Sequence, residues 1–163
     1  MMSKEAVRRL VESRLSTFVF GTEFGADTRY ANEAERSDSR QFTKFILDGS
    51  RKSYPNVPKQ PTPTSGRWLR LYDISFVLHK VASIGSEPCT RRTGVIIIDA
   101  FERLDAGTKR IFELTDAVEQ HFGLWTAPNF WTDPANTVNF PNDGDKNSYY
   151  QSRVYIPFTY DEN

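Results

Sequence analysis

Four segments in the last two-thirds of the chain, taken in order, constrain its fold more than any other feature. A Pro-rich loop leads into an extended run, then come a β-branched run, an amphipathic stretch and an alternating run. These segments are residues 54–76, 91–101, 108–122 and 149–160. With a short strand at 137–140 and an N-terminal helix, strands outnumber helices about two to one. We expect an α+β fold: a mostly antiparallel sheet of about four to five strands with two main helices packed on one face.

Two stretches have the spacing of amphipathic helices. From Ser3 to Thr17, apolar residues recur every three or four positions, and Ser3 suits the position that caps a helix N-terminus. The second stretch follows a turn at 105–108 and ends at Phe122, where Gly123 is the expected C-terminal cap.

The extended runs predict strands of different kinds. One face of the first is expected to hold Trp68, Arg70, Tyr72, Ile74 and Phe76, with Leu69 and Leu71 opposite. Residues 93–101 are continuous and β-branched, which predicts a strand covered on both faces. Residues 149–160 alternate, and Pro157 either places that strand at an edge or turns its missing N–H away from a neighbour.

Length and composition suit one domain spanning residues 1–163, with an insertion at 20–53. The chain is 38% hydrophobic and 26% charged, its longest apolar run (95–98) is too short to cross a membrane, and Cys89 is its only cysteine. The N-terminus lacks a secretory signal layout. We expect assembly in the cytoplasm and no membrane partner. The insertion is either a surface loop or an arm that orders against a neighbouring subunit.

Charge is distributed unevenly although the net charge is zero. Residues 1–110 hold 19 Lys and Arg against 13 Asp and Glu, whereas residues 111–163 hold 2 against 8. Either two surfaces differ in sign, or opposite faces attract in a head-to-tail ring.

The sequence offers no recognisable catalytic, metal or cofactor site. His79, His121 and Cys89 lack ligand spacing, and no strained nucleophile turn or phosphate-binding loop is present. We therefore expect a non-enzyme without metal or cofactor. The nearest match to a nucleic-acid surface is Arg67–Arg70, and the zero net charge argues against it.

Aromatic residues, 13% of the chain, lie partly in loops, where they favour interfaces. Together with two basic pairs, they form the predicted interface set: Phe24, Tyr30, Arg51, Lys52, Arg91, Arg92, Trp125 and Trp131.

The order of segments resembles the tail terminator (tail completion) family of long-tailed, lambda-like bacteriophages. The resemblance covers residues 3–17 and 54–160. It is carried by the N-terminal helix, Tyr54-Pro55-Asn56-Val57-Pro58, Gly66-Arg67-Trp68-Leu69-Arg70, Arg92-Thr93-Gly94-Val95, the helix closing on Phe122, and Tyr155–Tyr160.

The resemblance implies a structural virion protein at the head-proximal end of the tail. Six subunits would form a ring that caps the tail tube, stops its polymerisation and offers a docking surface for the head completion or connector protein. DNA would pass through the lumen without specific binding. An acidic lining would let it slide, and the predicted lining residues are Asp133, Asp143, Asp145, Asp161 and Glu162. The alternatives are another neck protein, such as a head completion, stopper or connector protein, and a small nucleic-acid-binding module.

Overall fold

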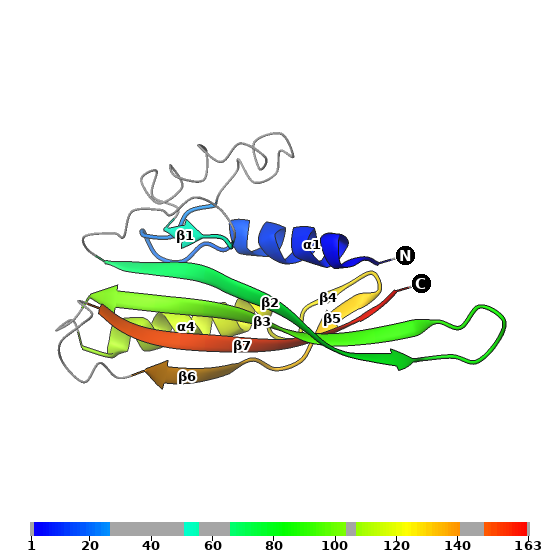
Figure 1. The fold of residues 1–163 in the computed structure, drawn as a ribbon. Coiled ribbons are helices and arrows are strands. Elements are labelled where there is room, and N and C mark those ends of the chain that lie inside the picture. Colours follow the sequence, from blue (N-terminus) through cyan, green and yellow to red (C-terminus); the bar gives the residue numbers. More distant parts are fainter. Residues whose placement is uncertain (1, 27–50, 56–65, 104–106, 141–148, 163) are drawn as a thin grey trace.

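The computed structural model describes residues 2–26, 51–55, 66–103, 107–140 and 149–162. These residues form two helices and seven strands in one sheet (Figure 1). The elements are α1 (Lys4–Ser16), β1 (Lys52–Ser53), β2 (Arg67–Val81), β3 (Thr90–Arg103), α4 (Lys109–Phe122), β4 (Thr126–Ala127), β5 (Phe130–Thr132), β6 (Asn136–Phe140) and β7 (Tyr149–Asp161).

The sheet confirms the α+β class but is wider than expected. Its strand order is β1-β2-β3-β7-β5-β4, and β6 also pairs with β7. The surplus over four or five strands consists of β1, β4 and β5, which have only two or three residues each. Strands so short carry no period-2 pattern, so the sequence did not reveal them. The sheet is also not wholly antiparallel, because β1 pairs in parallel with β2.

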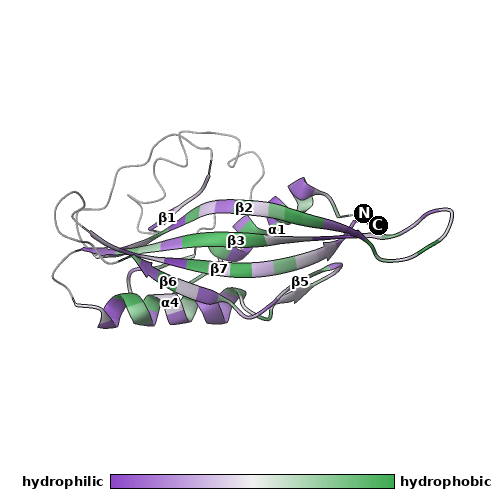
Figure 2. Cartoon of the chain, turned by 60° about the horizontal axis from the view of Figure 1, so that its bottom comes forward, coloured by the Kyte–Doolittle hydropathy of each residue, from purple (hydrophilic) through white to green (hydrophobic). Residues whose placement is uncertain are grey.

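Both helices pack against the same face of the sheet, as expected. The core joins Val11 of α1 and Leu114 of α4 with Ile98 of β3 and Ile156 of β7, and all four are fully buried. Apolar segments along the middle of β3 and β7 mark this centre in Figure 2. Ser3 caps α1, since its side-chain oxygen accepts a hydrogen bond from the Ala6 N–H at 3.1 Å.

The end of α4 differs from a left-handed glycine cap. Gly123 is extended there (φ −70°), and the next residue, Leu124, takes the left-handed conformation instead (φ 54°). Glycine is nevertheless required at 123 for space, because a Cβ would lie 2.6 Å from the Glu119 carbonyl oxygen.

A bulge in β2 corrects the predicted faces of that strand. Leu71 pairs with Ile98 and Asp73 with Ile97, so Tyr72 is an extra residue on β2. An extra residue reverses the alternation that follows it. Ile74 and Phe76 therefore share the core face with Leu71, rather than the face of Trp68.

Pro157 does not lie in an edge strand, because β7 has neighbours on both sides. The structure instead fits the second alternative, in which the missing N–H of Pro157 points away from a neighbouring strand. The Pro157 carbonyl accepts from the Asp133 N–H at 2.9 Å, so the nitrogen also points away from β3. It faces the gap in β7 pairing between Tyr155, the last partner of β6, and Phe158, the first partner of β5.

Candidate assembly interface

β2 and β3 continue beyond the packed body of the chain as a projecting hairpin. Figures 1 and 2 both show it extending past the two termini, away from α4. We call residues 77–92 the hairpin arm. Its apolar side chains are exposed: Val77 by 59%, Leu78 by 51%, Val81 by 65%, and Ile84 completely.

The junction between body and arm depends on close backbone approach. The register shifts between Phe76 and His79, where two β2 residues oppose Thr93 of β3, and the Leu78 N–H donates to the Thr93 hydroxyl. Beside this bulge, a Cβ on Gly94 would lie 2.2 Å from the Ser75 carbonyl oxygen and 2.4 Å from the Phe158 ring. Only glycine fits this point of β3 without moving backbone.

Two groups of charged residues tie the arm to the end of β7. Arg91 donates to Asp161 through Nε at 2.7 Å and Nη2 at 3.2 Å, and its guanidinium lies 4.9 Å from the centre of the Trp131 ring. The hydrogen bond to Asp161 raises the pKa of Arg91 above its ordinary value. This bidentate pair fixes the return strand of the arm.

The second group surrounds Glu162. The Thr90 hydroxyl donates to its carboxylate at 2.9 Å, His79 Nε2 lies 2.8 Å away, and Arg92 lies 3.8 Å away. The Thr90 hydrogen bond, followed by the contact with His79, holds the pKa of Glu162 below its ordinary value.

Five residues singled out in the sequence thus meet at the base of the arm. They are Arg91, Arg92, Trp131, Asp161 and Glu162. Their contacts with one another change the interpretation of the acidic pair: Asp161 and Glu162 are bound to basic side chains of their own subunit and offer little free negative charge for a lumen. Of the other predicted lining residues, Asp133 is exposed, whereas Asp143 and Asp145 lie outside the described residues.

Two of the predicted interface residues are buried within the subunit and cannot serve as a surface there. Phe24 is 2% exposed and packs against Phe18. Lys52 is completely buried, and its ammonium donates to three backbone carbonyls, those of Ser16, Phe18 and Gly25, at 2.6–3.1 Å. Lys52 therefore completes the end of α1 and the turn that follows it.

The remaining predicted interface residues are dispersed. Arg51 is half-buried next to β2, where its carbonyl accepts from the Leu69 N–H at 2.8 Å. Trp125 is half-buried beneath Arg14, whose guanidinium lies 4.9 Å from the ring centre. Tyr30 lies outside the described residues.

Among the described residues, the sheet face opposite the helices is covered by side chains rather than by a second layer. Asp99 is completely buried there between Arg70 and Arg153, each of which donates to its carboxylate at 2.7 Å. Trp68 stacks on Phe101 with ring centres 5.3 Å apart. The second cover predicted for residues 93–101 thus comes from arginine and aromatic side chains.

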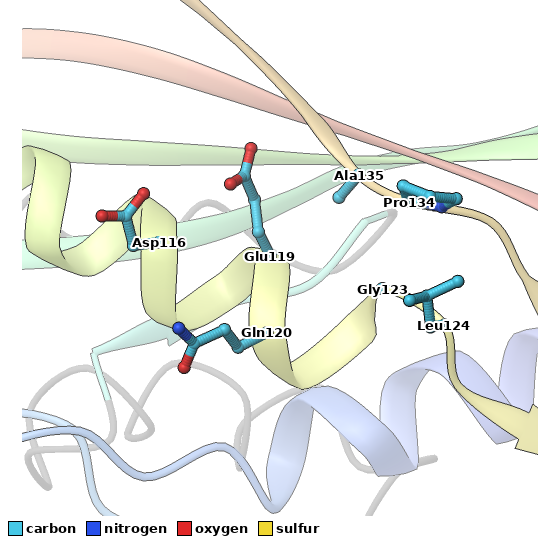
Figure 3. A pocket seen from close by; sticks show the side chains of 7 residues that line it. All are labelled: Asp116, Glu119, Gln120, Gly123, Leu124, Pro134 and Ala135. Carbon is cyan, nitrogen blue, oxygen red and sulfur yellow. The ribbon is translucent and has the colours of Figure 1, made fainter.

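A groove lies between α4 and the residues that lead into β6, on the face of the sheet that carries the helices. We call it the α4–β6 groove; its volume is about 370 Å³, and it is lined by Asp116, Glu119, Gln120, Gly123, Leu124, Pro134 and Ala135 (Figure 3). Glu119 accepts from the Thr137 hydroxyl at 2.6 Å, while Leu124 is 73% exposed. No basic side chain lines the groove among the described residues.

Within the described ranges, no three His, Cys, Asp or Glu residues group in a way that could hold a metal ion. None of the described helices is long and apolar enough to cross a membrane.

The arm, which is the main exposed apolar feature among the described residues, was not predicted from the sequence. The first extended run was predicted to end at Phe76, whereas β2 continues to Val81. Val77, Leu78 and Val81 continue the β-prone composition beyond Phe76, and this was the available signal.

Comparisons with known proteins find the same fold in a solved structure but assign no family to the chain. No protein-family model matches the chain, and no curated protein matches it. One solved structure, whose name describes no function, has a TM-score of 0.57 and 13% identity, covering 98% of this chain and 96% of the other. The two proteins share a fold. Another, described as the virion of a native gene transfer agent (GTA) particle, has a TM-score of 0.43 and 16% identity over 77% of this chain and 87% of the other. That similarity is too low to support an argument.

Proposed function

We propose that this chain is a structural subunit that assembles into a ring through its hairpin arm. The exposed arm is the observation that carries the proposal. Its four apolar side chains are not buried in the monomer and so do not stabilise it. Exposed apolar surface of this kind is characteristic of a contact made in assembly. The bulge, Gly94 and the Arg91–Asp161 pair hold the arm in a defined direction, as an assembly contact requires.

The resemblance of the sequence to tail terminators supplies the more specific proposal. The ring would have six subunits, cap the head-proximal end of a phage tail tube, stop tube polymerisation and offer a surface to the head completion or connector protein. The protein would be a virion component assembled in the host cytoplasm, with DNA passing through the ring without specific binding, and it would have no enzymatic activity.

Another neck protein is the second candidate, because an arm that assembles a ring serves a stopper or connector equally well. Position separates the two candidates. A terminator binds the end of the tail tube, whereas a stopper or connector binds the portal side.

The test is the native mass of the purified chain over a concentration series, with electron microscopy of the largest species. We expect a six-subunit ring whose share of the total protein rises with concentration. A chain that remains monomeric at all concentrations contradicts assembly through the arm. A nucleic-acid-binding module would instead shift duplex DNA at low salt as a monomer.

A further inference from the structure

The hairpin arm and the α4–β6 groove are both exposed, and neither contacts the other within one subunit. The arm leaves the body in the direction away from α4 in both views (Figures 1 and 2). We propose that the α4–β6 groove of one copy receives the hairpin arm of the next. This inference rests on the proposed ring and specifies which surfaces form it.

The groove combines negative charge at one end with apolar surface at the other. Asp116 and Glu119 lie on neighbouring turns of α4, while Leu124, Pro134 and Ala135 supply apolar surface at the other end (Figure 3). The Thr137 hydroxyl fixes the position of the Glu119 carboxylate. Such a groove suits a segment that carries one cation beside aliphatic side chains.

The arm has this chemistry. Lys80 is exposed and has no ion pair among the described residues, and the fully exposed Ile84 follows it four residues later in the loop. In the proposed contact, the Lys80 ammonium faces Asp116 and Glu119, and the Ile84 side chain covers Leu124. Glu87, beyond Ile84 in the loop of the arm, stays at the rim.

A second groove, between α1 and β2, is a less suitable receptor. Its volume is about 270 Å³, and it is lined by Lys4, Glu5, Arg8, Pro55, Asp73, Ile74 and Phe76. Its two cations are balanced by Glu5 and Asp73, and the Lys4 ammonium already lies 5.4 Å from the centre of the Phe76 ring. The α4–β6 groove has two carboxylates and no cation, so charge favours it for Lys80.

This pairing joins two different surfaces, so it is heterologous. Repeated from copy to copy, a heterologous contact produces a closed ring or an open filament rather than a two-fold dimer. It also gives a specific form to the head-to-tail attraction suggested by the uneven charge along the chain.

The first experiment exchanges the charges. Lys80→Glu and Asp116→Lys should each raise the concentration for half-assembly at least about tenfold, and the double variant should recover most of the loss. The matched controls are Lys109→Glu and Glu113→Lys, which reverse exposed charges of α4 outside the groove and should leave assembly unchanged.

A second experiment traps the contact directly. In a Cys89→Ser background, mixing Ile84→Cys with Leu124→Cys should give a mixed disulfide dimer under mild oxidation. If the wild-type chain assembles but single reversals match their controls and no mixed dimer forms, the groove is not the receptor, and the ring stands. If the wild-type chain remains monomeric and the two cysteine variants give no mixed dimer, both the ring and the groove contact are contradicted.

Discussion

β2 and β3 each cross two environments, and the two halves of the same pair of strands use their apolar residues in opposite ways. In the body, Leu71 and Ile98 pair across the strands and are completely buried beneath the helices. In the arm, Val81 pairs with Thr90 and is exposed, and Ile84 in the adjoining loop is exposed as well. The strands and their hydrogen bonding continue into the arm, but the helices that cover the strands in the body do not.

The difference separates residues that stabilise the subunit from residues available to a partner. Hydrophobic burial is the main term that stabilises a fold, and exposed side chains contribute little of it. Changes in the body should therefore unfold the chain, whereas changes in the arm should spare the fold and affect assembly.

A matched pair of isoleucines tests this contrast with the largest expected effect. Ile98→Ala creates a cavity in the core and should lower the free energy of unfolding by about 3–4 kcal/mol. Ile84→Ala, in the arm, should change it by less than about 0.5 kcal/mol. Urea unfolding measures both. Equal losses would show that the arm belongs to the core.

The body also depends on a buried cation. Lys52→Met keeps the length of the side chain but leaves the carbonyls of Ser16, Phe18 and Gly25 without this donor. The expected loss is about 2–3 kcal/mol. Lys109→Met, on the exposed surface of α4, is the control and should be neutral. Similar unfolding midpoints for the two variants would contradict a structural role for Lys52.

The junction of the two halves should show an intermediate effect. Gly94→Ala inserts a methyl group against the Ser75 carbonyl and the Phe158 ring, and it should cost about 2 kcal/mol. Gly25→Ala, where a Cβ meets nothing within 4 Å, should be nearly neutral. If the two variants unfold at the same temperature, the close approach of Gly94 to Ser75 and Phe158 does not contribute to stability.

The smallest effect is a pH dependence within the body. His121 Nε2 lies 2.7 Å from the Arg14 carbonyl, and burial lowers the pKa of His121 below its ordinary value of 6.5. The unfolded chain then binds this proton more readily than the folded one. The free energy of unfolding therefore keeps its full value above pH 6.5 and falls as the pH decreases from 6.5 towards the pKa of His121 in the folded chain. Urea unfolding at about pH 7.5 and about pH 5.5 should show the loss, and His121→Gln should reduce it. If the free energy of unfolding of that variant falls between the two pH values as much as that of the wild-type chain, a group other than His121 causes the loss.

Regular periodicity made part of this fold predictable. α1 and β7 follow from apolar residues at helical and alternating spacing, and the structure confirms both within a residue or two. Ser3 was identifiable as a cap because its role is local. The faces of β2 beyond Leu71 were not predictable, because the extra residue at Tyr72 leaves no sequence signal and reverses the alternation from Asp73 to Phe76.

The candidate interface was only partly predictable. Arg91, Trp131 and Asp161 were singled out separately, and their meeting depends on the pairing of β7 with β3 on one side and with β5 on the other. Lys52 was misassigned to the surface because sequence cannot show three backbone carbonyls converging on one ammonium. The arm was missed because exposed and buried valines are identical in sequence.

The most direct test of the account removes the apolar surface of the arm and leaves its strands in place. A variant with Val77→Thr, Leu78→Thr, Val81→Thr and Ile84→Thr keeps β-prone residues or a short polar side chain at each position. Its native mass should be compared with that of the wild-type chain at equal concentration by sedimentation. We expect a folded monomer beside a wild-type ring. A variant that still forms the wild-type ring would contradict assembly through the arm.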